Sequence, residues 1–396
     1  MSLRRASAVV ILGSAFGFGI NLLLTPVLSR LYSPEVFGLF STVIAVATSF
    51  VGISTLRLEV RAQSTSDDGD TWSLFRLALA AALASTLVSG VAAATAVVAG
   101  APLVWLAAPA IVLAGSVQIV GAATRVRKQQ YRHLGFANFV QGAGTGIVQV
   151  AAGAVSPQVW SLIAGFLAAR LIWLRGLFGL SKATRPLRVT WRENRRYAVT
   201  AGTSAGINSV AGQLIVILPA FFVGAAVAGA LAMAIRLLVS PLAIVAQGSS
   251  AAAIGEVGRL IRDRRSSLPI VDKAIRDLFV VGLLPCVGAA VLGPLLAPVV
   301  LGQEWAQTGS LLSLLAPGAL AQFVGSPWGQ LLNVTGRSDW LLRWDVLRLV
   351  LVASAVGIPL VMGMSVAVAV GTYSASQVLL YVLLVVIVRR SLRVST

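Results

Sequence analysis

The sequence predicts an all-α polytopic membrane protein with about twelve transmembrane helices. Of its 396 residues, 57% are hydrophobic and 11% are charged, whereas about 25% of residues are charged in an ordinary soluble domain. The apolar residues form long segments, and crossing about 30 Å of hydrocarbon takes about 20 of them in a helix. Short clusters of Lys and Arg separate these segments. A water-soluble fold could not bury this much apolar surface.

Twelve segments have the length and composition of spanning helices. Glycine and proline recur inside them, as at Pro219 and Pro285, which spanning helices tolerate where neighbours satisfy the freed backbone groups. All twelve are too long for transmembrane strands. Their approximate limits are 8–28, 36–56, 74–98, 103–123, 135–154, 158–179, 201–221, 227–252, 278–300, 308–332, 344–362 and 366–388.

The distribution of Lys and Arg predicts the orientation. If the N-terminus is cytoplasmic, all but three of the 31 basic residues fall in or beside cytoplasmic loops, as the positive-inside rule requires. Both termini are therefore expected in the cytoplasm. The net charge of +18 follows mainly from this topology. It does not indicate nucleic-acid binding, which needs a contiguous basic patch on a soluble module.

The middle of the chain predicts a division into two lobes. The longest cytoplasmic connection is an Arg-rich segment at 181–200, with six predicted spans on either side. We expect an N-terminal six-helix lobe at 1–180, a basic cytoplasmic linker at 181–200 and a C-terminal six-helix lobe at 201–396. Two halves of parallel topology place a binding site at their interface, near the middle of the bilayer.

The groups that enzymes use are scarce. The sole histidine, His133, lies in a basic loop, and the sole cysteine, Cys286, lies in an apolar segment. Asp67, Asp68 and Asp70 form a short acidic turn that is better explained by solvation than by a metal or sugar-nucleotide site. We therefore predict no catalytic residue, no metal site and no cofactor. Glu59 and Asp345, at the inner ends of spans, are expected to pair with neighbouring arginines.

The three basic residues that depart from the positive-inside pattern are the first candidates for a binding site. Arg236 lies about ten residues into its span, about 15 Å deep at helical rise, and Arg170 also lies near mid-depth. Arg30 is at the outer end of the first span. A guanidinium inside the membrane usually faces an aqueous cavity and marks a substrate path. The alternative is that Arg236 and Arg170 bind helix carbonyls or other polar groups of the bundle.

The chemistry of arginine suggests the cargo. Planar guanidinium groups bind phosphate through paired hydrogen bonds, so a cavity that they line suits an anionic, phosphate-bearing cargo. Polar side chains in the spans could contact sugar hydroxyls or join helices together. Asn21 and Asn208 are favoured among them because each lies in the first span of its half.

Several stretches resemble the oligosaccharide flippases of bacterial surface-polysaccharide synthesis, in the multidrug/oligosaccharidyl-lipid/polysaccharide exporter superfamily. The most specific are SRLYSPEVFG at 29–38 and the segment from Glu304 to Arg337, which contains EWA, LLAP, SP and LLNVTGR. LRLEVRAQ at 56–63 and IRLLVSPLAIVAQ at 235–247 also match. The resemblance covers both halves in order.

This resemblance implies a flippase that passes an undecaprenyl-diphosphate-linked oligosaccharide across the bacterial plasma (inner) membrane by alternating access. It supports Arg236 and Arg30 as cargo-binding residues. It also adds Arg57 and Arg61, which lie at the inner mouth, where the positive-inside rule explains them equally well. Arg170 rests on its depth in the membrane alone. Membrane lipids and other polysaccharide assembly proteins are the further expected partners. Transport is expected to be driven by protons, by sodium or by the membrane potential.

Two alternatives accompany this hypothesis. An ion-coupled exporter of drugs or metabolites in the same superfamily would need a carboxylate inside the membrane, and cavity arginines would repel organic cations. A membrane enzyme of polysaccharide assembly would need a large external loop or an aspartate-rich sugar-nucleotide motif in a cytoplasmic domain. The sequence shows none of these features.

Overall fold

The protein is built from helices, as the sequence predicts. The computed structural model describes residues 3–177, 184–262, 267–334 and 337–394, and these residues contain no β-strand. The chain divides into two compact units, Met1–Gln213 and Leu214–Thr396, referred to below as unit 1 and unit 2. The lobe limits at 180 and 201 stay a prediction. Of the proposed linker at 181–200, residues 181–183 lie outside the described part, and 187–200 are helical.

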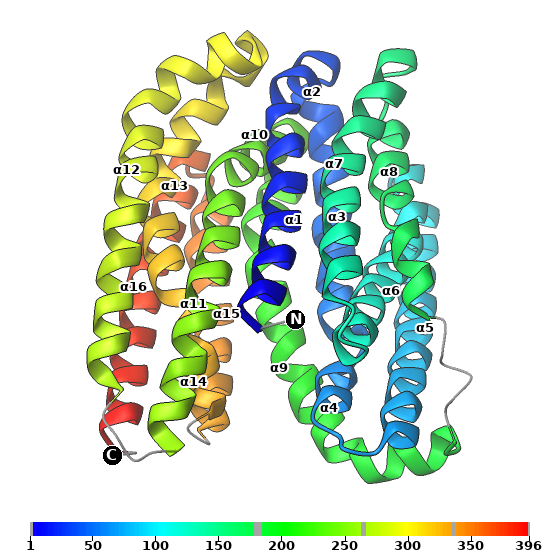
Figure 1. The fold of residues 1–396 in the computed structure, drawn as a ribbon. Helices are drawn as coiled ribbons and strands as arrows, with labels where there is room; N and C mark the ends of the chain where they lie inside the picture. The colour runs from blue at the N-terminus through cyan, green and yellow to red at the C-terminus, as the bar shows by residue number, and fades with distance from the viewer. Residues whose placement is uncertain (1–2, 178–183, 263–266, 335–336, 395–396) are drawn as a thin grey trace. The chain divides into compact units, whose positions relative to one another are not determined.

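Unit 1 contains the described helices of the first half of the chain (Figure 1). Long α-helices alternate with short helices that lie near their ends. The elements are α1 (Leu3–Leu23), α2 (Thr25–Leu31), α3 (Pro34–Ser54), α4 (Leu58–Gln63), α5 (Asp68–Val98), the 3₁₀ helix η1 (Leu103–Ala107), α6 (Ala108–Arg127), α7 (Tyr131–Val155), α8 (Val159–Ala168), the 3₁₀ helix η2 (Leu171–Leu177) and α9 (Leu187–Phe222), whose last part belongs to unit 2.

Unit 2 begins within α9 and continues to the C-terminal helix. One element of it is a π-helical turn, η4, which joins α10 and α11 without a break in the helix. The elements are α10 (Ala225–Ala234), η4 (Ile235–Val239), α11 (Ser240–Arg262), α12 (Leu268–Leu301), η5 (Gln303–Trp305), α13 (Ala306–Gly325), η6 (Ser326–Trp328), α14 (Gly329–Val334), α15 (Ser338–Val361) and α16 (Val366–Val394).

Eleven helical segments in the described residues are long and apolar enough to cross a membrane. They coincide with eleven of the twelve predicted spans. The twelfth prediction, 135–154, falls on α7, a helix of 25 residues that carries polar side chains such as Asn138, Gln141 and Gln149. The predicted fold class, an all-α polytopic membrane protein, is confirmed.

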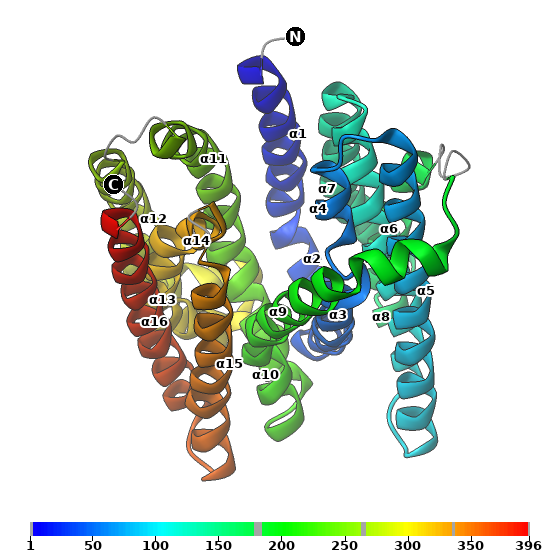
Figure 2. The same ribbon diagram turned by 90° about the horizontal axis from the view of Figure 1, so that it is seen from below.

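Glycines set the packing of α1 in unit 1. α1 lies along α7 (Figures 1 and 2), and a Cβ built at Gly17 would lie 2.7 Å from the carbonyl oxygen of Phe139. The Asn138 side chain donates a 2.8 Å hydrogen bond to the Ser14 hydroxyl across the same interface. Small residues allow this close approach of backbones, and polar side chains join the helices, as is common in membrane bundles.

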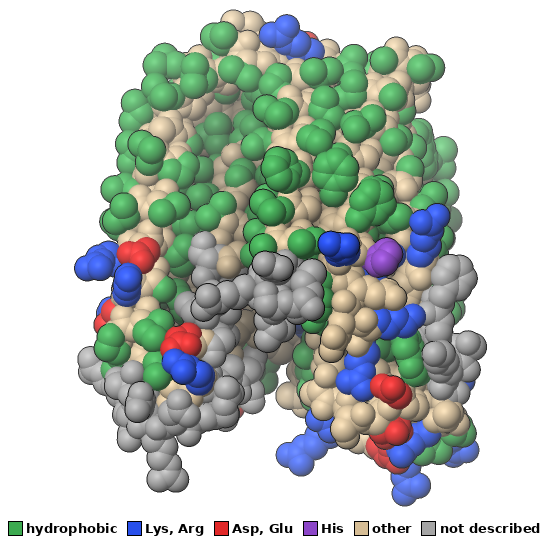
Figure 3. All heavy atoms as spheres, viewed as in Figure 1, with side chains coloured by type: hydrophobic (Ala, Val, Ile, Leu, Met, Phe, Trp, Pro, Cys, Tyr) green, Lys and Arg blue, Asp and Glu red, His purple; other side chains and the backbone are tan. Residues whose placement is uncertain are grey.

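Caps and ion pairs hold one end of unit 1 together. The Asp67 carboxylate accepts a 2.7 Å hydrogen bond from the Asp70 backbone N–H and so caps α5, satisfying a donor that a helix start leaves free. Asp68 pairs with Arg127 at the end of α6, at 2.8 Å. Asp70 pairs with Arg185, just before α9, at 2.6 Å. Figure 3 shows Lys and Arg side chains gathered at this end, next to a surface of hydrophobic side chains.

Unit 2 is held by close helix contacts around α13 and α16. α13 packs against α12 and α16, and α15 packs against α16. Prolines stand inside the long helices α12, α13 and α15 without ending them. Next to Pro317 in α13, the Ser374 hydroxyl of α16 accepts a 2.9 Å hydrogen bond from the Gly318 backbone N–H. A side chain of the neighbouring helix therefore satisfies backbone close to the proline, as membrane helices require.

Candidate functional site

Two of the predicted binding residues, Arg57 and Arg61, come together at the charged end of unit 1. Arg57 is exposed and stands in the left-handed region (φ 58°), directly after Leu56, which is also left-handed (φ 53°). Two such non-glycine residues in a row are strained and need support from their surroundings. The Tyr197 hydroxyl of α9 supplies some of it by donating a 3.3 Å hydrogen bond to the Arg57 carbonyl oxygen.

The same tyrosine also holds Arg61. The Arg61 guanidinium lies 5.7 Å from the centre of the Tyr197 ring, within the range of a cation–π contact. Among the described residues neither Arg57 nor Arg61 forms an ion pair. Both guanidinium groups are exposed and have donors free for an anion. The arrangement can therefore bind phosphate at this end of the unit.

Glu59 lies between these arginines along the chain but is buried, with 5% of its surface exposed. Sequence reasoning paired it with Arg57 or Arg61, whereas the described residues show no ion pair to it, and its Oε2 atom has no hydrogen-bond partner. Burial raises the pKa of the Glu59 carboxyl, and a hydrogen bond with Thr55 and the charge of Arg57 offset part of that rise. The site therefore contains a carboxyl that takes up a proton more readily than an exposed one does.

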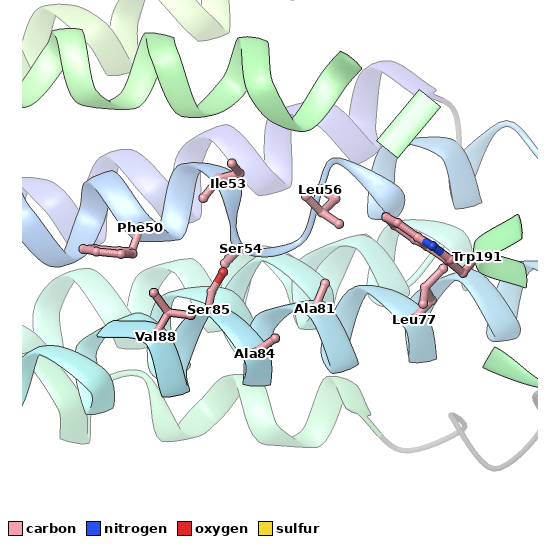
Figure 4. Close-up of a pocket in the computed structure, with 10 residues that line it drawn as sticks. All are labelled: Phe50, Ile53, Ser54, Leu56, Leu77, Ala81, Ala84, Ser85, Val88 and Trp191. Atoms are coloured by element: carbon pink, nitrogen blue, oxygen red, sulfur yellow. The ribbon is translucent and has the colours of Figure 1, made fainter. Parts of the chain in front are cut away.

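An apolar cavity of about 500 Å³ lies beside this loop. In Figure 4, residues of α3 face residues of α5 across it, and Trp191 of α9 lies at one end, beside Leu77. The Ser54 hydroxyl at the cavity wall accepts a 2.7 Å hydrogen bond from Ser116 of α6. The lining residues are Phe50, Ile53, Ser54, Leu56, Leu77, Ala81, Ala84, Ser85, Val88 and Trp191.

Arg170 lies apart from that cluster, where α8 ends and η2 begins. Its Nη1 atom donates a 2.9 Å hydrogen bond to the Phe166 carbonyl oxygen, and the guanidinium stacks 3.4 Å from the centre of the Phe166 ring. Its Nε atom is buried, and no described residue accepts a hydrogen bond from it. These contacts match the alternative stated for this residue, in which the arginine binds a helix carbonyl, and the buried Nε donor is available to a further partner.

Arg236 belongs to unit 2 and stands in the π-helical turn η4, half-buried. The turn packs against α13 and α12, and the Ser240 hydroxyl donates a 3.2 Å hydrogen bond to the Ile235 carbonyl oxygen within it. π-turns are rare and occur frequently at functional sites, because they change the direction of side chains within a helix. The position of Arg236 therefore distinguishes it from the other basic residues that the structure describes.

The remaining predicted residues lie on three different helices of unit 1. Arg30 is exposed in the last turn of α2. Asn21 is half-buried in α1, facing Gly146 of α7 closely enough that a Cβ on the glycine would lie 2.8 Å from the Asn21 Oδ1 atom. Asn208 is half-buried in α9. Within unit 1 the structure thus groups Arg57 with Arg61, and leaves Arg30, Asn21, Asn208 and Arg170 at separate places.

Sequence reasoning expected Asp345 to pair with a neighbouring arginine, but it did not predict how deeply the charged cluster between α15 and α16 is buried. Asp345 and Arg348 are 2% and 5% exposed, although both were expected at the inner end of a span. The Arg348 guanidinium lies 5.8 Å from the Trp344 ring and 5.9 Å from the Tyr381 ring. Gln377, one turn before Tyr381, donates a 3.1 Å hydrogen bond to the Tyr373 hydroxyl. The only sequence signal was the pair of opposite charges three residues apart.

Comparison with known proteins places the chain in a family. A family model described as polysaccharide biosynthesis protein matches residues 27–309, which include Arg30, Arg57, Arg61, Arg170 and Arg236. The chain belongs to this polysaccharide biosynthesis protein family. The family resemblance recognised in the sequence, to proteins of bacterial polysaccharide synthesis, is thereby confirmed. A comparison with curated protein sequences gives no match.

Solved structures show the fold of this polysaccharide biosynthesis protein. The lipid II flippase MurJ in an inward closed conformation matches with a TM-score of 0.69 at 12% identity, covering 97% of this chain and 87% of that one. A MATE structure in complex with MaD5 matches with a TM-score of 0.65 at 13% identity, with 98% and 96% covered. An inward-facing multidrug resistance MATE transporter of the MOP superfamily has a TM-score of 0.58 at 11% identity, with 100% and 96% covered. The protein is therefore a multi-pass membrane protein with the fold of the MOP superfamily.

The described residues also indicate which kinds of ligand this protein can bind. No group of three or more His, Cys, Asp or Glu side chains in them could hold a metal ion. The conspicuous polar groups are guanidinium groups, set against aromatic rings or exposed at the charged end of unit 1. Such groups bind anions, phosphate among them.

Proposed function

We propose that the protein is a flippase that moves an undecaprenyl-diphosphate-linked oligosaccharide across the bacterial plasma membrane by alternating access, for surface polysaccharide synthesis. The observation that carries the proposal is the match of residues 27–309 to a polysaccharide biosynthesis family in a chain with the fold of MurJ. The polyprenyl tail stays in the bilayer during this step. The protein has to stabilise only the diphosphate and the sugars.

The arginines support this cargo. Arg57 and Arg61 are exposed beside each other at the charged end of unit 1, and Arg236 stands in a π-turn inside a spanning segment. Guanidinium groups bind a diphosphate through charge-assisted paired hydrogen bonds. Glu59 is a buried carboxyl whose Oε2 atom has no hydrogen-bond partner among the described residues and whose pKa is raised, which favours the proton over sodium as the coupling ion.

The test is transport in cells in which the gene is deleted and supplied in variant form. Arg236→Ala is expected to lower the rate at which lipid-linked glycan reaches the outer surface by about tenfold, because one charge-assisted hydrogen bond is worth about 1.5 kcal/mol. The glycan precursor should accumulate on the cytoplasmic face. Arg343→Ala is the matched control, because Arg343 is exposed in the same unit. Normal export by Arg236→Ala, at equal protein amount in the membrane, contradicts the proposal.

The likeness to MATE structures favours one second candidate, an ion-coupled exporter of small molecules. The two functions differ in their substrates. Deletion of an exporter gene sensitises cells to organic cations and leaves surface glycan unchanged, whereas deletion of a flippase gene does the reverse. Measuring both in the same deletion strain separates them.

A further inference from the structure

The apolar cavity between α3 and α5 is elongated along the helices that line it. On α5 its walls run from Leu77 to Val88, a rise of about 16 Å at 1.5 Å per residue. The hydrocarbon core of a bilayer is about 30 Å thick, so this length corresponds to one leaflet. Small side chains on α5, among them Ala81 and Ala84, leave the space open (Figure 4).

The cavity is accessible from the outside of unit 1. Val88 and Ile53, at its edges, are 59% and 37% exposed, and Ala84 is exposed as well. These residues lie in spanning segments, at the depth of the hydrocarbon core of the bilayer. A chain in the membrane can therefore enter the cavity sideways.

One end of the cavity is aromatic and cationic. Trp191 closes it together with Leu56, and tryptophan is enriched at the level of the lipid headgroups. Arg188 and Arg195 precede and follow Trp191 by three and four residues on α9, hence on the same helix face, and both are exposed. Arg57 directly follows Leu56 and is exposed too. A lipid whose chain fills the cavity has its headgroup among these guanidinium groups.

We propose that this cavity holds the part of the polyprenyl chain nearest the headgroup of a polyprenyl-diphosphate lipid, with the diphosphate bound by Arg57, Arg188 and Arg195. The proposal rests on the proposed flippase function and names where the tail of its cargo binds. Charge decides between lipids. Several guanidinium groups at one mouth suit a diphosphate, which carries more charge than the phosphodiester of a phospholipid and accepts more paired hydrogen bonds.

The first experiment measures binding of undecaprenyl diphosphate to the full-length protein in nanodiscs. Ala81→Leu and Ala84→Leu fill the cavity and are expected to weaken binding at least tenfold. Ala94→Leu is the matched control, since Ala94 is exposed on α5 outside the lining, and it should bind as the wild type does. Arg188→Ala combined with Arg195→Ala should weaken binding tenfold and reduce its dependence on salt. Unchanged binding in both filled variants overturns the proposal.

A second measurement is independent of whether the filled variants fold well. Cys286 is the sole cysteine and is buried, so Ala84→Cys in a Cys286→Ser background gives one accessible thiol in the cavity. Undecaprenyl diphosphate is expected to slow its labelling by a maleimide at least fivefold, and phosphatidylglycerol at the same concentration should not. Equal protection by both lipids means that the cavity takes any membrane lipid and overturns the proposal.

The outcome for the cavity is separable from the outcome for transport. If the filled variants bind undecaprenyl diphosphate normally while Arg236→Ala still loses export, the tail lies elsewhere and the flippase function stands. If Arg236→Ala exports normally, the proposed function fails whatever the lipid-binding result. If the wild-type protein does not bind undecaprenyl diphosphate at all, the cavity proposal fails and the export measurement alone decides the function.

Discussion

The Tyr32 hydroxyl, at the end of α2, donates a 2.8 Å hydrogen bond to the backbone carbonyl oxygen of Gln149 in α7. Both residues are 1% exposed. The Gln149 side chain in turn donates a 3.0 Å hydrogen bond to the Leu162 carbonyl oxygen in α8. Three helices are thus tied at one level of unit 1. Tyr32 belongs to the SRLYSPEVFG segment that resembles the flippases, so this motif has a structural role in addition to any role in transport.

Replacing Tyr32 by phenylalanine tests this role. Tyr32→Phe keeps the ring and removes the hydroxyl, which should lower the free energy of unfolding by about 1 kcal/mol, the usual net worth of such a bond. Thermal unfolding of the purified protein in detergent measures the change. Tyr131→Phe, at the start of α7 and half-buried, is the control and should leave the melting temperature unchanged. A larger loss in the control than in Tyr32→Phe would contradict this interpretation.

The glycines of α1 make a second prediction. A Cβ at Gly17 would lie 2.7 Å from the Phe139 carbonyl oxygen and 2.8 Å from its Cα atom, whereas a Cβ at Gly19, two residues on, meets no atom within 4 Å. Gly17→Val should therefore separate α1 from α7 and destabilise the protein by about 3 kcal/mol. Gly19→Val should have little effect. Thermal unfolding and the amount of protein inserted in the membrane measure both, and similar behaviour of the two variants would refute the close packing.

The sequence was sufficient to predict those features of the fold that depend on hydropathy averaged over a long segment. Hydropathy over about 20 residues located eleven spans correctly, and the prolines in α12, α13 and α15 did not end those helices. α7 shows why an average can differ from a structure. Some of its polar side chains face inward, as Gln149 does at 1% exposed. The average hydropathy of α7 is therefore lower than that of the eleven helices that qualify as spans, although α7 occupies the place of the remaining predicted span.

The site depended on details that no average contains. Leu56 and Arg57 adopt left-handed conformations, although neither is a glycine, so the sequence does not indicate the turn. The turn leaves the Arg57 side chain exposed and the Glu59 side chain buried. Arg61 could be predicted at this end, but its stacking on Tyr197 joins residues far apart in the sequence. The cavity depends on α3, α5 and α9 together, so its small alanines look like any others in an Ala-rich span.

The buried carboxyl of Glu59 predicts a dependence of stability on pH. Burial raises its pKa above the ordinary value of 4.5, so the folded state binds the proton more tightly than the unfolded state does. Stability from this group is fully present below the unfolded pKa and is lost as the pH rises through the folded pKa. Glu59→Gln, which imitates the protonated form, should remove this loss and melt higher than the wild type at neutral pH.

The measurement is the melting temperature of both proteins between about pH 4 and pH 8. The difference between Glu59→Gln and the wild type should be small at the acidic end and should grow with pH. Glu193→Gln is the control, because Glu193 is exposed and paired with Arg185. A difference that shrinks as the pH rises would show that the Glu59 carboxyl is stabilised in its charged form, which contradicts the burial argument.

The cluster of Asp345 and Arg348 gives the last prediction. Both side chains are almost fully buried, and the Arg348 guanidinium lies close to the rings of Trp344 and Tyr381. Removing one member of a buried group of opposite charges leaves the other charge uncompensated, which costs about 3–5 kcal/mol. Arg348→Ala should therefore destabilise the protein strongly, while Arg343→Ala, exposed on the same helix, should not. The double variant Asp345→Asn with Arg348→Gln should recover part of the loss, because it buries no charge. If the double variant is as unstable as Arg348→Ala, packing against the two rings, and not charge compensation, is what Arg348 contributes.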